Sequence, residues 1–309
     1  TVDDDLEAAK LGSCRCRALA ELDVAAPRIV DTLRLAQLAG TDGRHRLLEH
    51  RLDLDLGYKI SEGALVGENN VVLRDFELGD KVEELILERN GDKVLVKVKV
   101  PRNNSNNISS DLVIRVPEDS AIDVSTVSAD ITVEGVRGDS LVLSTVSGDV
   151  EAEASSRRLE LASVSGDVAF EGAAERTRAE SVSGDVTLIG VAGEVEASTV
   201  SGDVTLEGGL LDSGRFETVS GELNLMMELA DSGRLDCDAM SGDINLRLPS
   251  GQQGSFSAQS YSGSIGSEFG DPKRHGKSSN GSMLKAEVGD NGARIRLETF
   301  SGDISIRAQ

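Results

Sequence analysis

Tryptophan is absent from this 309-residue sequence, and all aromatic residues together make up only 3% of it. Proline is also scarce, with 5 residues against 33 glycines, while the hydrophobic share of 39% is rich in Val, Leu and Ile. This composition is typical of short β-strands joined by glycine turns. It leaves few aromatic platforms on which sugar rings could stack, yet it contains enough apolar residues for a buried core.

Basic residues and long apolar runs are also under-represented. The 32 Lys and Arg residues against 54 Asp and Glu residues give a net charge of −22, which opposes contact with nucleic acid or an anionic membrane surface. No run approaches the ~18 apolar residues of a membrane-spanning helix. We therefore expect no nucleic-acid partner and no transmembrane segment, whereas cations, basic surfaces and neutral glycans remain open as partners.

The 3 cysteines are too few for a disulfide framework. Cys14 and Cys16 could be grouped with His45 and His50 as metal ligands. The single residue between the two cysteines is tighter than the usual spacing of zinc ligands, so we expect no metal site from this group.

One short phrase recurs almost verbatim: TVSGDV at 145–150, SVSGDV at 163–168 and 181–186, and TVSGDV at 199–204. Its aspartates are separated by 19, 18, 18 and 18 residues and stand at Asp130, Asp149, Asp167, Asp185 and Asp203. Further copies at Glu222, Asp243, Ser264 and Asp303 complete nine copies that cover Ile122 to Ile306. A fixed period of this length indicates a solenoid.

Each copy alternates apolar and polar residues with a period of two, which predicts a half-buried strand on either side of the turn. The sequence therefore predicts an all-β fold: a single-chain parallel β-helix with coils of about 18–21 residues, right-handed by crossover chirality. Columns led by Leu159 and Leu161 are expected to face inward, with Cys237 among them. We also expect the residues just before each Ser-Gly pair to face inward: Val127, Val146, Val164, Val182, Val200, Val219, Met240, Tyr261 and Phe300.

A solvent-facing column alternates in charge from one coil to the next: Glu160, Arg178, Glu196, Arg215 and Asp236. Opposite charges on neighbouring strands attract, although each exposed pair contributes only ~0–1 kcal/mol. We interpret this column as a device that fixes the register of the coils.

The phrase itself has two interpretations. Its glycines permit a positive φ and its aspartates can accept a backbone N–H in an Asx-type turn, which makes the phrase a structural turn. The turn glycines are Gly148, Gly166, Gly184, Gly202, Gly221, Gly242, Gly263 and Gly302. The alternative is a stacked carboxylate ladder that binds Ca²⁺, with Asp149, Asp167, Asp185 and Asp203 as the candidate ligands.

These turns, with Val before most Ser-Gly pairs and Val or Ile after most of the acids, resemble those of a bacterial adhesin-like β-strand-repeat family. That family is a domain of unknown function found in exported envelope proteins. The resemblance covers roughly residues 83–309 and includes the strand pair EELILERNGDKVLVKVKVP, in which Asn90-Gly91 suits a hairpin turn. It implies an exported β-helix in the periplasm or at the cell surface, with no catalytic residues to carry over.

Residues 1–75 depart from this pattern. Between Asp3 and Gly40 the chain is rich in Ala and Leu at helical spacing, which predicts a helical or disordered segment. The expected organisation is therefore an N-terminal segment at 1–75 and a β-helix repeat domain at 76–309. Because solenoid ends expose unpaired strands, uncapped ends would favour end-to-end association.

We expect a non-enzymatic protein of the cell envelope that acts as a scaffold or an adhesin-like surface for an envelope protein or a glycan. One alternative is a polysaccharide lyase or hydrolase, for which Glu217 and Asp238 would lie one coil apart with Arg215 nearby. Solvated surface acids explain these residues equally well. The other alternative is a Ca²⁺-stabilised array; no other cofactor is expected.

A candidate binding loop lies in the longest gap between copies, which separates Ser264 from Asp303. This gap holds a basic cluster on an otherwise acidic protein: Lys273, Arg274, His275 and Lys277. Such a loop could contact an anionic polymer or fold back on the acidic coils.

Overall fold

The structure, a computed structural model, describes residues 110–274, 281–290 and 292–309, together with strands β1 to β7 between residues 11 and 99. The regular elements of this part are all β-strands, and it contains no helix long and apolar enough to span a membrane. The chain divides into two compact units, residues 1–156 and 157–309. Strand β12 (Val150–Ser165) runs across the boundary.

In the first unit, β9 pairs in parallel with β11, and β10 pairs in parallel with β12. The hairpin predicted around Asn90-Gly91 is confirmed, because β6 and β7 pair antiparallel. The strands of this unit are β1 (Leu11–Arg17), β2 (Ala20–Ala25), β3 (Lys59–Ser61), β4 (Ala64–Val66), β5 (Val72–Leu78), β6 (Glu84–Asn90), β7 (Lys93–Lys99), β8 (Ser110–Pro117), β9 (Ala121–Thr126), β10 (Ile131–Val136) and β11 (Ser140–Ser147).

Two described stretches of the N-terminal segment form strands where the Ala and Leu spacing predicted a helix. Strand β1 pairs antiparallel with both β8 and β10, and β2 pairs antiparallel with both β7 and β9. Each backbone is therefore hydrogen-bonded on two sides. Such pairing outweighs a helical preference, which amounts to tenths of a kcal/mol per residue. Most of the other residues in 1–75 lie outside the described part.

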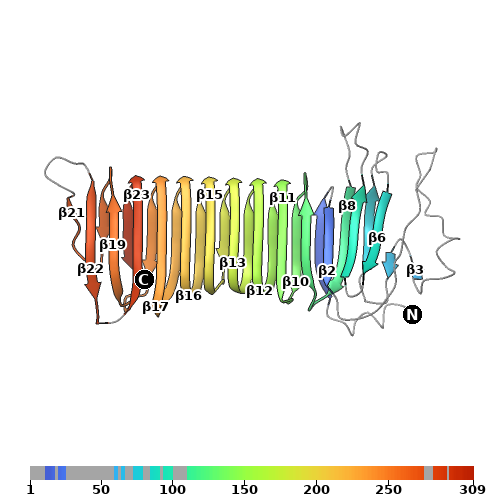
Figure 1. Ribbon diagram of the computed structural model, residues 1–309, viewed down its shortest axis with the longest axis horizontal. Helices are drawn as coiled ribbons and strands as arrows, with labels where there is room; N and C mark the ends of the chain where they lie inside the picture. Colours follow the sequence, from blue (N-terminus) through green and yellow to red (C-terminus); the bar gives the residue numbers. More distant parts are fainter. Residues whose placement is uncertain are drawn as a thin grey trace. The chain divides into compact units, whose positions relative to one another are not determined.

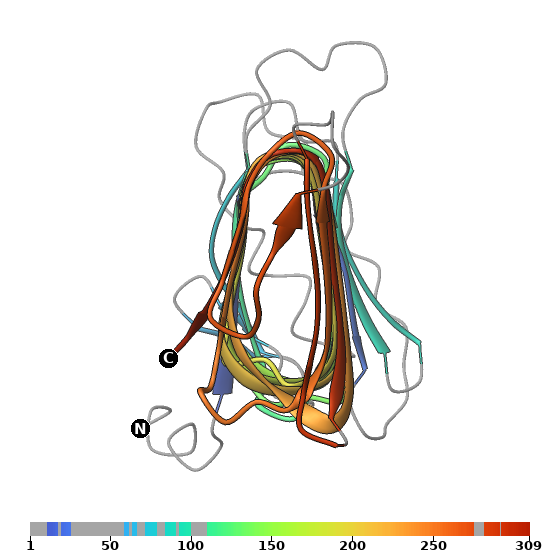
Figure 2. The same ribbon diagram turned by 90° about the vertical axis from the view of Figure 1, so that its left-hand side faces the viewer.

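The second unit is a parallel β-solenoid, which confirms the predicted fold. Figure 2 shows its coils superposed as an oblong loop with two long sides. We call the side that leads into each Ser-Gly turn the first wall, and the side that follows the turn the second wall. The strands are β13 (Val168–Ser183), β14 (Val186–Ile189), β15 (Gly193–Ser201), β16 (Val204–Ser220), β17 (Leu223–Ser241), β18 (Ile244–Leu248), β19 (Gly254–Ser260), β20 (Ile265–Ser267), β21 (Lys273–Arg274), β22 (Ser282–Val288), β23 (Ala293–Ser301) and β24 (Ile304–Ala308).

The spatial order of the last coils differs from their sequence order. In the first wall β23 pairs in parallel with β17 on one side and with β19 on the other, and in the second wall β24 lies between β18 and β20 in the same way. Figure 1 shows β23 between β17 and β19. Residues 293–308 therefore form the coil next to β17 and β18. The coil that follows β18 in the sequence, which contains β19 and β20, lies on the far side of it.

The outer edge of the terminal coil is covered by the chain that separates the two last copies. Strand β22 pairs antiparallel with β19 along its whole length, and the ring of Phe269 stacks on that of Phe256 with their centroids 4.9 Å apart. Phe256 is buried, so Phe269 closes the hydrophobic core at this end. The end at β19 is therefore capped, and the condition stated for end-to-end association does not apply to it.

The core follows the predicted period of two. Inward columns contain Leu159 and Leu161, then Ala179, Ala197 and other side chains of the same parity, all almost fully buried. Cys237 lies in this column, is buried and is a free thiol. Burial raises the pKa of this thiol far above its ordinary value, and the neighbouring Asp238 and Asp236 add to the rise. The thiol is therefore held neutral inside the core, as its column predicted.

Candidate functional site

The residue before the Val of each phrase points into the core. Strict alternation from Leu159 and Leu161 places Ser163 inward, and the equivalent Ser or Thr of the other coils is buried too. These hydroxyls donate to the turn carbonyl of the preceding coil: Ser181 Oγ lies 3.1 Å from Gly166 O, and Thr199 Oγ1 lies 3.0 Å from Gly184 O. A buried hydroxyl thus bonds a turn carbonyl of the neighbouring coil.

The turn glycine is needed for close approach between coils. A Cβ added at Gly202 would lie 2.2 Å from the carbonyl oxygen of Gly184, and one added at Gly184 would lie 2.1 Å from that of Gly166. No side chain can occupy that space without moving the backbone. The expected role in a positive φ is not what distinguishes these two glycines, because neither of them has a φ in the left-handed region.

The aspartate side chains bond between coils, not within their own turn as the Asx-type interpretation expected. Oδ1 of Asp167 accepts the N–H of Asp185 at 2.8 Å, and Oδ1 of Asp185 accepts the N–H of Asp203 at 2.8 Å. Asp149 N–H donates likewise to Asp130 Oδ1 at 3.1 Å in the first unit. The Asp130, Asp167, Asp185 and Asp203 carboxylates are therefore part of a backbone ladder, which Asp149 joins through its backbone N–H. Among the described residues no group of three or more His, Cys, Asp or Glu could hold a metal ion.

The Val between this hydroxyl and the turn points outward. Val200 is 47% exposed and Phe300 is 62% exposed, so the inward placement predicted for this column is wrong. Val164 lies three residues after the buried Leu161, so strict alternation places it on the outward face. The expectation of burial followed from its apolar type and not from its position in the alternation. In spatial order the exposed residues of the second unit are Val164, Val182, Val200, Val219, Met240, Phe300 and Tyr261; we call them the apolar ridge. Val127 and Val146 are the equivalent exposed residues of the first unit.

The apolar ridge grows wider toward the capped end of the solenoid. Valine occupies its first positions, followed by Met240 and then by two aromatic rings whose centroids lie 5.9 Å apart, those of Phe300 and Tyr261. Exposed apolar side chains aligned on successive strands form a continuous strip, whereas isolated ones are ordinary on a protein surface. This strip is a departure of the described surface from a simple polar repeat.

Acidic side chains lie on both sides of the apolar ridge. Two residues before the ridge, on the same face of the first wall, are the strand-side acids: Glu180, Glu217, Asp238 and Glu298. Three residues after the ridge are the turn-side acids: Asp167, Asp185, Asp203, Glu222, Asp243 and Asp303. All of them are exposed or half-buried. The ridge is therefore an apolar strip with carboxylates on both sides.

Asp238 differs from the other strand-side acids. Glu180, Glu217 and Glu298 each form an ion pair with the Arg two residues earlier on the same strand. Before Asp238 that position is occupied by Asp236, which pairs with Arg234 at 2.5 Å. Within the part of the chain that the structure describes, the Asp238 carboxylate forms no ion pair.

The surroundings of Asp238 form a shallow depression of about 450 Å³ beside the apolar ridge. Its lining combines apolar ridge side chains with carboxylates: Val200, Val219, Met240, Phe300, Glu217 and Asp238. Burial raises the pKa of the Asp238 carboxyl, and Arg296 opposes the rise. The acids on either side, Glu298 and Glu217, and Asp236 raise this pKa further. The depression therefore places a poorly neutralised carboxylate among apolar side chains.

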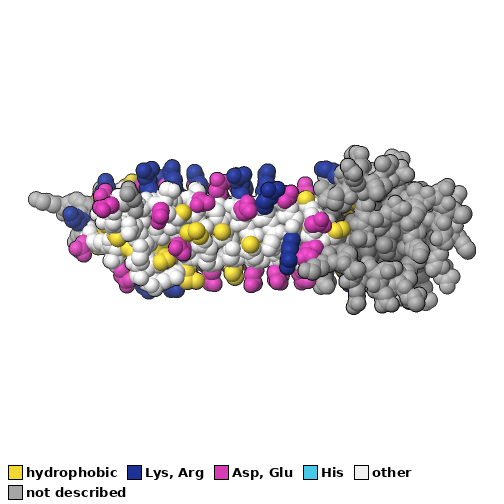
Figure 3. Space-filling model, turned by 90° about the horizontal axis from the view of Figure 1, so that it is seen from below, with side chains coloured by type: hydrophobic (Ala, Val, Ile, Leu, Met, Phe, Trp, Pro, Cys, Tyr) yellow, Lys and Arg dark blue, Asp and Glu magenta, His cyan; other side chains and the backbone are white. Residues whose placement is uncertain are grey.

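The predicted charge alternation is present in the second unit. Arg178 bonds Glu196 on the next strand at 3.3 Å and Glu180 on its own strand at 2.5 Å, and Arg215 is in register with Asp236. Because β23 lies next to β17, Arg296 follows Asp236 and extends the alternation by one more coil. Figure 3 shows Lys and Arg side chains gathered along one side of the described surface.

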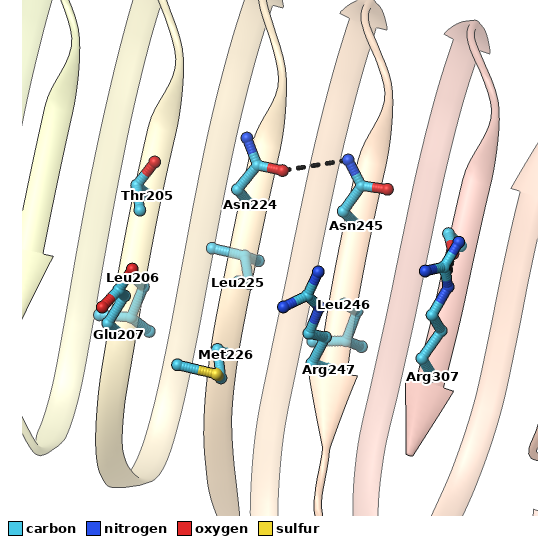
Figure 4. Close-up of a pocket in the computed structure, with 11 residues that line it drawn as sticks. Thr205, Leu206, Glu207, Asn224, Leu225, Met226, Asn245, Leu246, Arg247 and Arg307 are labelled. Atoms are coloured by element: carbon cyan, nitrogen blue, oxygen red, sulfur yellow. Dashed lines mark hydrogen bonds between the residues drawn. The ribbon is translucent and has the colours of Figure 1, made fainter. Parts of the chain in front are cut away.

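A second depression, of about 270 Å³, lies on the second wall (Figure 4). Arg247 and Arg307 stand in register on neighbouring strands beside an amide ladder in which Asn245 Nδ2 donates to Asn224 Oδ1 at 3.0 Å. Arg307 Nε bonds Ser305 Oγ at 3.1 Å. Both guanidinium groups are exposed to solvent, and the exposed Glu207 lines the same depression, so this surface is polar and carries charges of both signs.

The remaining candidates from the sequence are dispersed. Lys273 and Arg274 form β21, which pairs antiparallel with β22; His275 and Lys277 lie outside the described residues, as do His45 and His50. Cys14 and Cys16 lie on β1, where only the backbone is described. Glu217 and Asp238 are in register one coil apart, as expected. Both stand on one wall of the sheet, and Glu217 is paired with Arg215.

The fold and this surface define the class of protein. It is a parallel β-solenoid whose repeated sequence places a buried hydroxyl against the turn carbonyl of the neighbouring coil and an apolar side chain on the surface. The chain belongs to the Toastrack DUF4097 family, whose model matches residues 70–307. This confirms that the repeats belong to a domain family of unknown function. No curated protein and no solved structure matches the chain.

Proposed function

We propose that this protein is a non-enzymatic scaffold of the cell envelope, exported to the periplasm or the cell surface, that binds a segment of another protein along the apolar ridge. The observation that carries the proposal is the strip of exposed apolar side chains on successive strands of a hydrogen-bonded wall. Contiguous exposed apolar surface of this kind marks interaction sites in soluble proteins. The adhesin-like description fits the same idea of a binding surface.

The non-enzymatic part of the proposal is supported by the arrangement of the acids. The two carboxylates considered for catalysis, those of Glu217 and Asp238, stand side by side on one wall. Acid–base hydrolysis of a glycosidic bond needs two carboxyl groups on opposite sides of that bond. Incubation with bacterial polysaccharides should therefore release no new reducing ends or unsaturated sugars; release that is lost in Asp238→Asn would overturn this part.

The scaffold role is tested by site-specific photo-crosslinking in cells that make the protein. A photoreactive residue replaces Val182, Val200 or Val219 in turn, and Thr187 on the second wall serves as the control position. We expect the same partner protein, identified by mass spectrometry, at all three ridge positions and not at Thr187. Fractionation of the same cells should recover the protein with the envelope. No adduct at the ridge, or recovery in the cytoplasm alone, would refute the proposal.

A further inference from the structure

We propose that the partner segment is a cationic amphipathic α-helix, which lays its apolar stripe along the apolar ridge and places a Lys or Arg side chain in the depression at Asp238. This inference rests on the proposed function and adds the chemistry of the partner. Three properties of the surface lead to it: the spacing of the ridge, the acids on both sides of it and the unpaired carboxylate.

The spacing of the ridge suits a helix. Neighbouring strands of a sheet lie ~4.8 Å apart, so the seven residues of the ridge span about 29 Å. An α-helix presents apolar side chains on one stripe once per turn, every ~5.4 Å, and about 20 residues cover this length. Same-face residues of an extended strand are ~6.6 Å apart. Against the ~4.8 Å spacing of the ridge, the mismatch per contact is ~1.8 Å for a strand and ~0.6 Å for a helix, so a strand loses register about three times faster.

The charge of the surface selects the sign of the partner. On the turn side a row of acids follows the ridge from Asp167 to Asp303. On the strand side Glu180, Glu217 and Glu298 are paired with Arg, whereas Asp238 has no ion pair among the described residues. A helix with Lys or Arg facing the turn side and one cation at Asp238 would therefore meet opposite charges. The same acids oppose a second copy of this chain, because two identical ridges would bring like charges together. They also oppose an anionic membrane surface.

Asp238 supplies a specific anchor for one cationic side chain. Its carboxylate is half-buried and has no ion pair among the described residues, while Val219, Met240 and Phe300 line the same depression. A Lys or Arg stem packs on apolar surface while its charged end reaches a carboxylate. The faces of the Phe300 and Tyr261 rings offer a further contact for such a cation.

The test uses the full chain and a fluorescent 20-residue helix of Leu and Lys, designed with one apolar stripe and measured by fluorescence anisotropy. A scrambled peptide of the same composition controls for attraction to the net charge of −22. We expect the amphipathic helix to bind at least about tenfold more tightly than the scrambled peptide. A Leu and Glu analogue should not bind.

Variants locate the site. We expect the double variant Met240→Ser, Phe300→Ser to weaken binding by about tenfold or more, and Asp238→Asn to weaken it by about three- to tenfold. Leu210→Ser removes an exposed apolar side chain away from the ridge, and Glu171→Gln removes an exposed acid of the second wall. These controls should change the affinity by less than about twofold, with the melting temperature of every variant recorded to show that it folds.

Equal affinity for the scrambled peptide, or equal weakening in Glu171→Gln and Asp238→Asn, would reduce the interaction to non-specific attraction and overturn the inference. Binding of the chain to anionic vesicles through the ridge, or a ridge-dependent dimer in sedimentation, would assign the surface to a membrane or a second copy. If the peptide fails while ridge crosslinks to a partner persist in cells, only the cationic helix is wrong. If both fail, the proposed function fails as well.

Discussion

The backbone N–H of Asp303 donates a hydrogen bond of 2.7 Å to Oδ1 of Asp243, across a sequence separation of 60 residues. Ser264, which precedes Asp303 in the sequence, lies on the far side of it, and its N–H donates to Asp303 Oδ1 at 2.7 Å. In space, the ladder of turn side chains therefore runs from Asp243 to Asp303 and then to Ser264. The closing coil is held by neighbours on both sides.

Removal of this coil should release the end of the solenoid. A chain that ends at residue 291 keeps β19 and β22 but lacks the strand that joins β19 to β17. We expect amides of residues 254–260 to exchange hydrogen rapidly in this variant, while those of β15 and β16 stay protected. A chain that ends at residue 249 should retain the same protection in β15 and β16. Slow exchange at 254–260 in the longer truncation would contradict the assigned order.

Replacement of a turn glycine should destabilise the coil stack. In Gly202→Ala the new Cβ would lie 2.2 Å from Gly184 O, which forces neighbouring coils apart. We expect the melting temperature to fall by roughly 5–10 °C, as for other changes that strain a packed backbone. Gly251→Ala is the matched control, since nothing lies within 4 Å of its added Cβ, and its melting temperature should stay within about 1 °C of the parent's. Equal melting of the two variants would argue against close approach as the role of Gly202.

Reversal of one charge in the alternating column should have a modest effect. Arg178→Glu removes the ion pairs to Glu180 and Glu196 and leaves three acids close together. Because the pairs are exposed, we expect the melting temperature to fall by only about 1–4 °C at low salt and by less in 1 M NaCl. The melting temperature of Arg178→Gln should lie between those of the parent and of Arg178→Glu. An unchanged or higher melting temperature would show that this column does not contribute to coil pairing.

Neutralisation of Asp238 should stabilise the protein in a pH-dependent way. The pKa of this carboxyl is raised by burial and by the acids of β16, β17 and β23, Glu217, Asp236 and Glu298, against the opposing effect of Arg296. A carboxyl with a raised pKa in the folded state costs stability when it is ionised, so the cost is present above that pKa and disappears below the ordinary value.

We therefore expect Asp238→Asn to melt about 1–3 °C higher than the parent at pH 7.5, with the difference shrinking as the pH falls toward 4.5. Thermal melts at several pH values measure this directly. Glu171→Gln, on the exposed second wall, controls for the change in net charge. A lower melting temperature for Asp238→Asn at pH 7.5 would contradict the assignment of an unneutralised carboxylate.

Calcium should leave the ladder of aspartates unchanged. Each Oδ1 of Asp167 and Asp185 already accepts a backbone N–H at 2.8 Å, and a Ca²⁺ site needs 6 to 8 oxygen ligands in about 2.3–2.6 Å contact. We expect 5 mM CaCl₂ and NaCl of equal ionic strength to give melting temperatures within about 1 °C of each other. A rise specific to Ca²⁺, lost in Asp185→Asn, would instead support the calcium-stabilised array.

Much of the fold could be predicted because its period is short and its turns repeat. The alternation around Leu159 and Leu161 gave the buried columns, and the charge sequence from Glu160 to Asp236 gave the pairing of coils. The position of Val164 was also determined by that alternation, but its apolar type was given more weight than its parity. The place of Ser163, two residues after Leu161 and therefore on the inward face, was the signal that could have revealed the exposed ridge.

The order of the last coils could not be predicted from the same pattern. Every copy carries the same turn, so alternation does not distinguish Asp243 followed by Ser264 from Asp243 followed by Asp303. One signal did exist: the alternating charge column continues from Asp236 to Arg296, whereas the copy next in sequence offers Ser257. The unpaired state of Asp238 had a signal within β17, where Asp236 stands in place of the Arg that pairs with the other strand-side acids. The shift of its pKa also depends on neighbours from β16 and β23, which the sequence of β17 alone does not contain.

The coil that fills the gap between β17 and β19 also sets the order in which this end can fold. Strand β19 cannot pair in its final place until residues 293–308 have been synthesised, because its partner in the first wall comes later in the chain. Each coil up to β18 stacks on a coil that precedes it in the sequence, so these coils can pair while the chain is being synthesised. The capped end therefore matures only after residues 293–308 have been made, and the wide aromatic part of the ridge, built by Phe300 beside Tyr261, forms later than the valine part.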